Sequence, residues 1–369
     1  MSMNMNSNNE KVIKIKYHEA AAFMNENGAN VLGREFFIKD VKTEKSVDAP
    51  LSTSARDILC SVTRPSLVSN IFIIDEDDSF ICTRAAAGSD GKICFVSKQE
   101  DGFAATPVLE RNEAFRGLQS RLDGGAPAAD MDVSFVVSHK DLFVLAAAAD
   151  LYVRKRMLCF LGHSAPYISL NSAEVLYMLE DGLASKDPRW LVYFFQMCMP
   201  YSGPEFDEQM VSQSLKQLSE IGLINRELSS LTDSGMLLGI SHYRRLSMIG
   251  LNMAGAKEDG SLASQRSAFL RGDRLLWFID DSTGSGGGVE ISSISISKAC
   301  SILNELFTPE GIPADADTES HAYMPQDVHE EENQFDTPKF CNKCGKSLKA
   351  GAKFCGSCGN EIKVKRNEA

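Results

Sequence analysis

The chain has 369 residues, of which 43% are apolar and 24% are charged, and its formal net charge is −12. This length and composition are typical of a soluble globular protein of two or three domains. The net negative charge disfavours a general nucleic-acid-binding surface. The most apolar stretches hold about ten apolar residues each and are too short to span a bilayer.

The first residues, "MSMNMNSNNEKVIKIK", have no apolar run behind the first charge and therefore predict no signal peptide. We expect a cytoplasmic protein that does not engage a membrane. Thiols stay reduced in that compartment, so clustered cysteines favour a metal site over a disulfide.

Residues 1–122 are predicted to form an N-terminal α+β subdomain. Short runs rich in β-branched and aromatic residues alternate there with Asp/Gly turns, which indicates an antiparallel meander. We expect a helix to follow, with Asn112 as its N-cap. The acidic run "DEDD" at 75–78 is interpreted as a tight turn, with a bound cation as the less favoured alternative. "GGAPAAD" at 124–130 predicts a loop between subdomains.

Residues 131–240 are predicted to be mainly helical. "VSFVVSHKDLFVLAAAADLYVRKRMLCFL" indicates a strand followed by a buried helix. In "NSAEVLYMLEDGLA", Asn171 is followed three residues later by Glu174, which is the spacing of a capping box. "DEQMVSQSLKQLSEIGLI" carries apolar residues at helical spacing, and Gly222 is placed to end that helix.

The phrase "SLKQLSEIGLI", followed by "NRELSSLTDSG" with Thr232 as a further cap, resembles the recognition helix, wing and next helix of a winged helix-turn-helix domain. This resemblance covers about seventy residues and rests on pattern alone. A helix that reads DNA usually offers Arg or Lys, but residues 207–220 contain a single basic residue, Lys216. We therefore expect this winged-helix-like region to pack or to contact protein.

Residues 241–307 are predicted to form a C-terminal α+β subdomain that repeats the order of the first. Strand-like runs separated by turns are again followed by a helix, here with Ser297 as the expected cap. The predicted fold class is therefore α+β. Two small antiparallel β-meander/helix subdomains are expected to flank the winged-helix-like region.

Residues 308–338 contain nine Asp or Glu and no Lys or Arg, with recurring proline and no apolar period. Such a composition predicts a disordered acidic linker. The ribbon and tail that follow, residues 339–369, carry eight Lys or Arg against two Glu. The body, residues 1–307, is thereby left with a net charge of about −9.

Residues 339–362 hold two C-x-x-C-G pairs, formed by Cys341 with Cys344 and by Cys355 with Cys358. Two such turns supply four thiolates, which is the closed tetrahedral shell of structural zinc. A thioredoxin-like redox pair is the alternative, but it requires one C-x-x-C in a βαβ context. The stretch resembles the short zinc ribbons at the ends of many bacterial proteins, and the resemblance implies that these four cysteines bind one structural Zn²⁺.

The other cysteines stand singly in apolar surroundings, and we expect them to be small buried side chains. They are Cys60, Cys82, Cys94, Cys159, Cys198 and Cys300. No histidine lies in a metal-binding or nucleophile-activating motif, and the glycine-rich run at 282–289 lacks the Lys-Ser/Thr of a phosphate-binding loop.

We therefore expect no enzymatic activity. The predicted function is that of an adaptor or regulatory module acting through protein–protein contacts with an unidentified partner. The alternative is a DNA-binding transcriptional regulator that uses the winged helix and the basic ribbon, and it is not favoured. An exposed apolar patch on the body would support the adaptor, and a basic concave face would support the regulator.

Overall fold

The computed structural model describes residues 12–34, 37, 51–125, 133–163, 170–225, 231, 245–256, 262–281 and 288–307. The chain divides into two compact units, Met1–Ala322 and Tyr323–Ala369. All described residues belong to the first unit. The predicted linker and zinc ribbon lie outside them.

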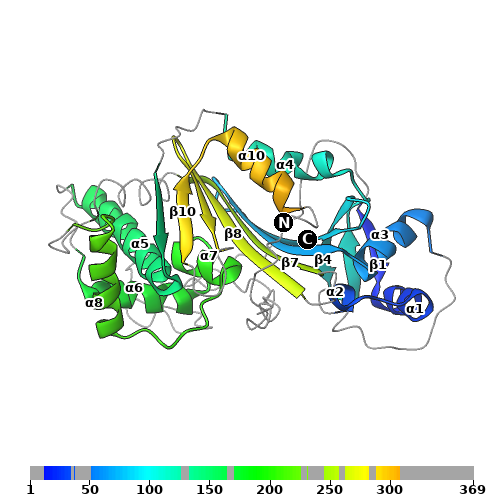
Figure 1. The fold of residues 1–369 in the computed structure, drawn as a ribbon, viewed down its shortest axis with the longest axis horizontal. Coiled ribbons are helices and arrows are strands. Elements are labelled where there is room, and N and C mark those ends of the chain that lie inside the picture. The colour runs from blue at the N-terminus through cyan, green and yellow to red at the C-terminus, as the bar shows by residue number, and fades with distance from the viewer. Residues whose placement is uncertain are drawn as a thin grey trace, which may run out of the picture. The chain divides into compact units, whose positions relative to one another are not determined.

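The described strands form one antiparallel sheet in the order β1-β5-β4-β3-β2-β7-β8-β9-β10-β6 (Figure 1). The strands of its first half are β1 (Ile13–Lys16), β2 (Leu67–Asp75), β3 (Phe80–Ala87), β4 (Ile93–Gln99) and β5 (Gly102–Ala105). Those of its second half are β6 (Ser134–Val137), β7 (Arg245–Ala256), β8 (Leu262–Gly272), β9 (Leu276–Asp280) and β10 (Val289–Ser293). The two halves meet where β2 pairs with β7.

Each half uses the same order of elements: an edge strand, a group of helices, a four-stranded meander and a closing helix. The helices of the first half are α1 (Tyr17–Asn27), α2 (Val31–Gly33), α3 (Thr53–Thr63) and α4 (Arg111–Asp123). Those described in the second half are α5 (His139–Leu161), α6 (Ser172–Ser185), α7 (Leu191–Cys198), α8 (Glu208–Glu220) and α10 (Ile296–Leu306). The repeated unit is thus larger than the meander and helix expected from sequence.

The centre of the sheet repeats at the level of single residues. Asn70 lies opposite Asn252 across the β2–β7 junction. Arg84 lies opposite Asn70 in one half, and Arg266 lies opposite Asn252 in the other. This correspondence places an approximate two-fold axis at the Asn70–Asn252 pair.

The predicted α+β class and the two antiparallel meanders are confirmed. The meanders do not form two separate small sheets, because β2 and β7 pair along the whole of β2 and join them into one. The predicted helical region contributes β6 to an edge of this same sheet.

Apolar clusters cover both faces of the sheet. On one face, α4 and α10 pack side by side (Figure 1), and the rings of Phe115 and Phe307 lie 4.4 Å apart between centroids. The helices α5 to α8 pack on the other face, against side chains that include Phe72 and Trp277. Because successive residues of a strand point to opposite faces, β2 supplies Ile71 and Ile73 to the first cluster and Phe72 to the second.

The observed helix ends confirm two of the predicted capping residues and contradict two others. The Asn171 side chain accepts a hydrogen bond from the Glu174 backbone N–H at 2.8 Å, as predicted. Gly222 follows the end of α8 with a φ of +83°, which favours glycine. The predicted caps Asn112 and Ser297 are wrong, because α4 and α10 begin earlier, with Glu110 and Ser295 at the N-cap positions.

A buried carboxylate joins α5 to α7. Trp190 precedes α7 and has no side-chain oxygen that could cap it. Instead the Asp150 carboxylate of α5, which is fully buried, accepts hydrogen bonds from the backbone N–H groups of Leu191 and Val192, both at 3.1 Å. A negative charge at a helix N-terminus is favourable, so Asp150 fixes α7 against α5.

We expect Asp150→Asn to destabilise the body by about 1–3 kcal/mol, because the amide turns one acceptor into a donor that faces backbone donors. Urea denaturation at pH 7, with an unchanged m-value, measures this loss. Asp181→Asn on the exposed side of α6 is the matched control and should stay close to the parent. Equal stability of the Asp150 variant and the parent would contradict the capping role.

Candidate functional site

The four predicted zinc ligands, Cys341, Cys344, Cys355 and Cys358, lie outside the described residues. Within the described part, no three His, Cys, Asp or Glu side chains gather in a way that could hold a metal ion. Thr232, the predicted cap behind the wing, also lies outside it.

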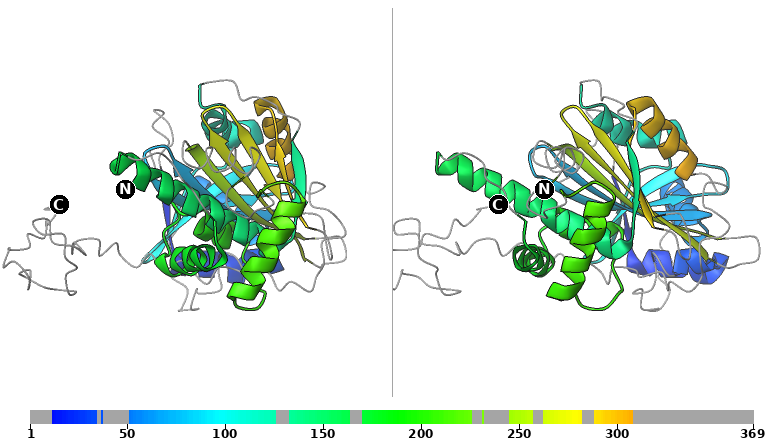
Figure 2. Two further views of the ribbon diagram at one scale, coloured as in Figure 1. Left: turned by 90° about the vertical axis from the view of Figure 1, so that its left-hand side faces the viewer. Right: turned by 60° about the vertical axis from the view of Figure 1, so that its left-hand side comes forward.

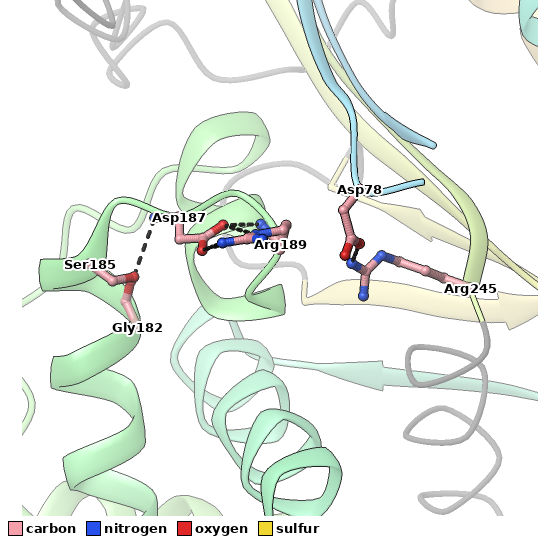
Figure 3. A network of polar contacts seen from close by, with 6 residues as sticks. All are labelled: Asp78, Gly182, Ser185, Asp187, Arg189 and Arg245. Atoms are coloured by element: carbon pink, nitrogen blue, oxygen red, sulfur yellow. Dashed lines mark hydrogen bonds and ion pairs between the residues drawn. The ribbon is translucent and has the colours of Figure 1, made fainter. Parts of the chain in front are cut away.

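The acidic turn at residues 75–78 is occupied by the chain's own arginines. The Asp75 carboxylate accepts a hydrogen bond from Arg121 Nε at 2.8 Å, and Asp78 forms an ion pair with Arg245 at the start of β7 (Figure 3). The Asp78 backbone N–H also donates to the Asp75 carbonyl at 3.0 Å, closing the turn. The interpretation as a plain turn fits these contacts.

A second ion pair stands on the loop between α6 and α7 in the same view (Figure 3). Burial opposes ionisation of Asp187. Hydrogen bonds from Arg189, one of them from Nε at 2.9 Å, outweigh burial and hold the pKa of Asp187 below its usual range. The positive charges of Arg189 and Arg245 add to this effect.

The single cysteines only partly fulfil the prediction of burial. Cys94 and Cys198 are buried, and burial raises the pKa of the Cys94 thiol to about 12. Burial also raises the pKa of Cys198, to which the charge of Asp281 contributes. Such thiols are poor nucleophiles. The prediction is wrong for Cys60 and Cys82, which are exposed because their helix and strand positions face solvent.

One cluster of titratable groups crosses from α5 to the sheet. His139 Nε2 lies 2.9 Å from Asp281 Oδ2, and Arg266 Nη1 lies 3.6 Å from the same oxygen. The buried Cys198 is near enough to feel the charge of Asp281, but its Sγ donates to the Phe194 carbonyl at 3.2 Å. Because this thiol is protonated and donates to a backbone carbonyl, it does not form a nucleophile–base pair with His139.

The helix α8, predicted to be the recognition helix, turns Val211, Leu215 and Leu218 toward the core. Its exposed positions are Glu208, Gln209, Ser212, Gln213, Lys216, Gln217 and Glu220. This face carries one base and two acids. Ile224 and Leu231 form an isolated antiparallel bridge, the place at which a wing was predicted.

The C-terminal end of α5 is an exposed apolar surface. From Asp141 to Tyr152 the helix is buried on every side. Val153 still packs against the core, and Arg154 and Lys155 contact α6. The last turns of the helix then extend past the neighbouring helices into solvent (Figure 2). Its last large apolar side chains are exposed, namely Met157 (50%), Leu158 (59%), Phe160 (77%) and Leu161 (71%). We call these four residues the apolar α5 end.

Sequence reasoning expected "RMLCFL" to be buried, and that expectation is wrong. A helix turns by about 100° per residue, so the four side chains cover an arc of roughly 160° around the last turns. Tyr177 of α6 stands nearby, with the Arg154 guanidinium of α5 5.8 Å from its ring centroid, and is itself 55% exposed. Half of the large apolar side chains that are exposed in the described part of the chain are these five.

Comparisons with known proteins identify one part of the chain. Residues 340–362 match the family model of the zinc-ribbon domain, and all four predicted ligands fall inside the match. The chain therefore carries a zinc-binding module at these residues. A search of curated proteins found no match.

A search of solved structures found a similarity to the type VII secretion system chaperone EspG5 of Mycobacterium tuberculosis, solved in complex with the PE25–PPE41 dimer. The identity is 6%, the TM-score is 0.40, and the match covers 84% of this chain and 99% of that one. A TM-score below 0.5 does not establish a common fold. None of the described helices is both long and apolar enough to cross a membrane.

We expect Arg189→Ala to raise the pKa of Asp187. Burial raises this pKa, and the variant lacks the side-chain hydrogen bonds and the positive charge that lower it. In the parent the lowered pKa means that Asp187 stabilises the fold above about pH 4 and loses this effect as the pH falls through its folded pKa. In the variant the folded and unfolded pKa values should be closer, so that this stabilisation becomes smaller and the carboxyl titrates at a higher pH than in the parent. Carboxyl ¹³C titration by NMR measures both midpoints. Arg154→Ala is the control, and an unchanged Asp187 midpoint in Arg189→Ala would contradict the assignment.

Proposed function

We propose that this chain is a non-enzymatic adaptor, in which the body binds protein through the apolar α5 end and the zinc ribbon makes a second contact. The observation that carries the proposal is the exposure of Met157, Leu158, Phe160 and Leu161 at the end of one helix. Clustered exposed apolar side chains of this kind mark contact sites in soluble proteins.

A partner that covers these side chains would remove their apolar surface from water. Burying a large apolar side chain is worth about 1.5–3 kcal/mol relative to leaving it in water. The Phe160 side chain is the most exposed of the four, and it stands beside Met157, whose flexible thioether adapts to irregular surfaces. A partner that buries this end would therefore obtain much of its binding free energy from a few adjacent side chains, as at an interface hot spot.

The ribbon supplies the second module. Its donor set of four cysteines in two C-x-x-C-G turns fits zinc. We propose that Cys341, Cys344, Cys355 and Cys358 bind a single Zn²⁺, whose role is structural because four thiolates leave no coordination position for a substrate. A module of this size has too small an apolar core to fold without the metal.

The alternative, a DNA-binding regulator, finds less support. The exposed face of α8 offers only Lys216 to a phosphate backbone, with Glu208 and Glu220 at its two ends. The basic residues at 339–369 remain its best argument. We therefore assign the winged-helix-like region to packing within the body.

Metal analysis tests the ribbon. We expect one zinc per purified chain, released by a thiol-modifying reagent. Cys341→Ser should lose the metal but keep the thermal melting of the body, because the ribbon belongs to a separate compact unit of the chain. Cys60→Ser, which replaces an exposed cysteine of α3, should retain zinc. Absence of zinc from the parent chain would contradict the assignment.

A capture experiment tests the protein-contact function. The parent chain, Phe160→Asp and Val31→Asp are immobilised and exposed to a nuclease-treated lysate of the source cells. Val31 is 54% exposed on α2, so its variant adds the same charge at an exposed apolar site elsewhere. We expect proteins captured by the parent and by Val31→Asp to be lost with Phe160→Asp. Identical captured sets for all three baits would contradict the role of the α5 end.

A further inference from the structure

The charge, shape and size of the apolar α5 end indicate what binds to it. We propose that it binds the same surface of a second copy of this chain, with the two α5 ends antiparallel across a two-fold axis near Leu158. This inference rests on the proposed function, because it names the occupant of the protein-contact surface defined there.

The charges along α5 suit an antiparallel pair of helix ends. Arg154, Lys155 and Arg156 form a basic band in the turn immediately before the apolar end. In an antiparallel pair centred on Leu158, residue 154 of one copy lies opposite residue 162 of the other. Lys155 and Arg156 are bonded within their own copy, to Glu174 and to the Tyr152 hydroxyl. Arg154, on the same side of α5 as the apolar end, then stands beside the C-terminus of the facing helix, where the macrodipole is negative.

The surface around the apolar α5 end carries both positive and negative charges. On α6, Glu174 receives a hydrogen bond from Lys155 Nζ at 2.7 Å, and Asp181 lies 3.9 Å from Arg154 Nη1. The Arg154–Asp181 pair is exposed and therefore weak, so it can be exchanged for contacts across an interface. A patch with adjacent basic and acidic bands is self-complementary under a two-fold rotation, as an isologous interface requires.

The shape of the apolar α5 end also suits a pair of helices. The apolar arc of Met157, Leu158, Phe160 and Leu161 continues the side of α5 on which Arg154 lies. Two helix ends with such arcs can pack side by side as neighbouring helices do in a bundle. Tyr177 of each copy then stands at the margin of the contact, beside its own Arg154.

The size of the patch sets the expected strength. Four side chains and Tyr177 would bury on the order of 400 Å² per copy, or about 800 Å² in total, which is below the roughly 1,000 Å² of a stable specific interface and corresponds to a weak, transient contact. We therefore expect a reversible dimer with a Kd on the order of 10–100 µM. Such a dimer is populated at high concentration and dissociates on dilution.

Sedimentation equilibrium of the full chain between about 5 and 500 µM tests the proposal, with circular dichroism to confirm folding of each variant. We expect the parent to pass from monomer to dimer over this range. Phe160→Asp and the milder Leu158→Ser should weaken dimerisation at least tenfold, because each reduces the apolar contact at the axis. Val31→Asp should dimerise like the parent.

Two results would overturn the inference: a parent chain that is monomeric throughout the range, or a folded Phe160→Asp variant that dimerises as the parent does. A monomeric parent would remove the second copy as the occupant while leaving the protein-contact function to the capture experiment. Conversely, a parent dimer that Phe160→Asp abolishes supports self-pairing even where the captured sets of the baits are identical.

Discussion

The antiparallel pairing of β2 with β7 is the constraint on which the rest of the body depends. It joins two four-stranded meanders that would each otherwise expose a long unpaired edge. Because β2 becomes a central strand, it is buried on both faces, and its sequence is apolar almost throughout. Its one amide, Asn70, lies opposite Asn252 at the approximate two-fold axis. A slip of one residue here would exchange the two faces of every side chain in β2.

This junction also determines where the helices lie. Since both halves follow the same order of elements, their closing helices α4 and α10 meet over the middle of one face of the sheet. The helices that follow the edge strands differ in length, with 11 residues in α1 and 23 in α5. The additional turns at the end of α5 have no further apolar core to pack against. They extend beyond α6 and α7, and the apolar α5 end is the consequence.

Much of this architecture follows from local sequence signals. Alternating runs with Asp/Gly turns predicted both meanders, and the repeated order of these runs predicted the duplication. The two C-x-x-C-G pairs predicted the zinc ribbon because ligand spacing is a local property. In contrast, the β2–β7 pairing joins segments about 180 residues apart, and no residue in either strand specifies the other as its partner. For the same reason Asp150 could not be recognised as the cap of α7.

The apolar α5 end shows the limit of reading burial from hydropathy. "MLCFL" is as apolar as the buried "LFVLAAAA" earlier in the same helix, and the packing of α6 and α7 distinguishes them. The basic triplet before it was the available signal, because long charged side chains are rarely buried without a partner. Its position marks the point at which α5 leaves the core.

The central claim is that the α5 end is a protein-contact surface, and the most direct measurement is photo-crosslinking from that position. With a benzophenone side chain in place of Phe160, irradiation of the purified chain at high concentration, and of source cells expressing it, should give covalent protein adducts. The same group in place of Val31 should give few. In the purified chain, adducts that map by mass spectrometry to residues 154–161 or Tyr177 of a second copy would place the contact where the account puts it. Yields at Phe160 no higher than at Val31, in both settings, would contradict it.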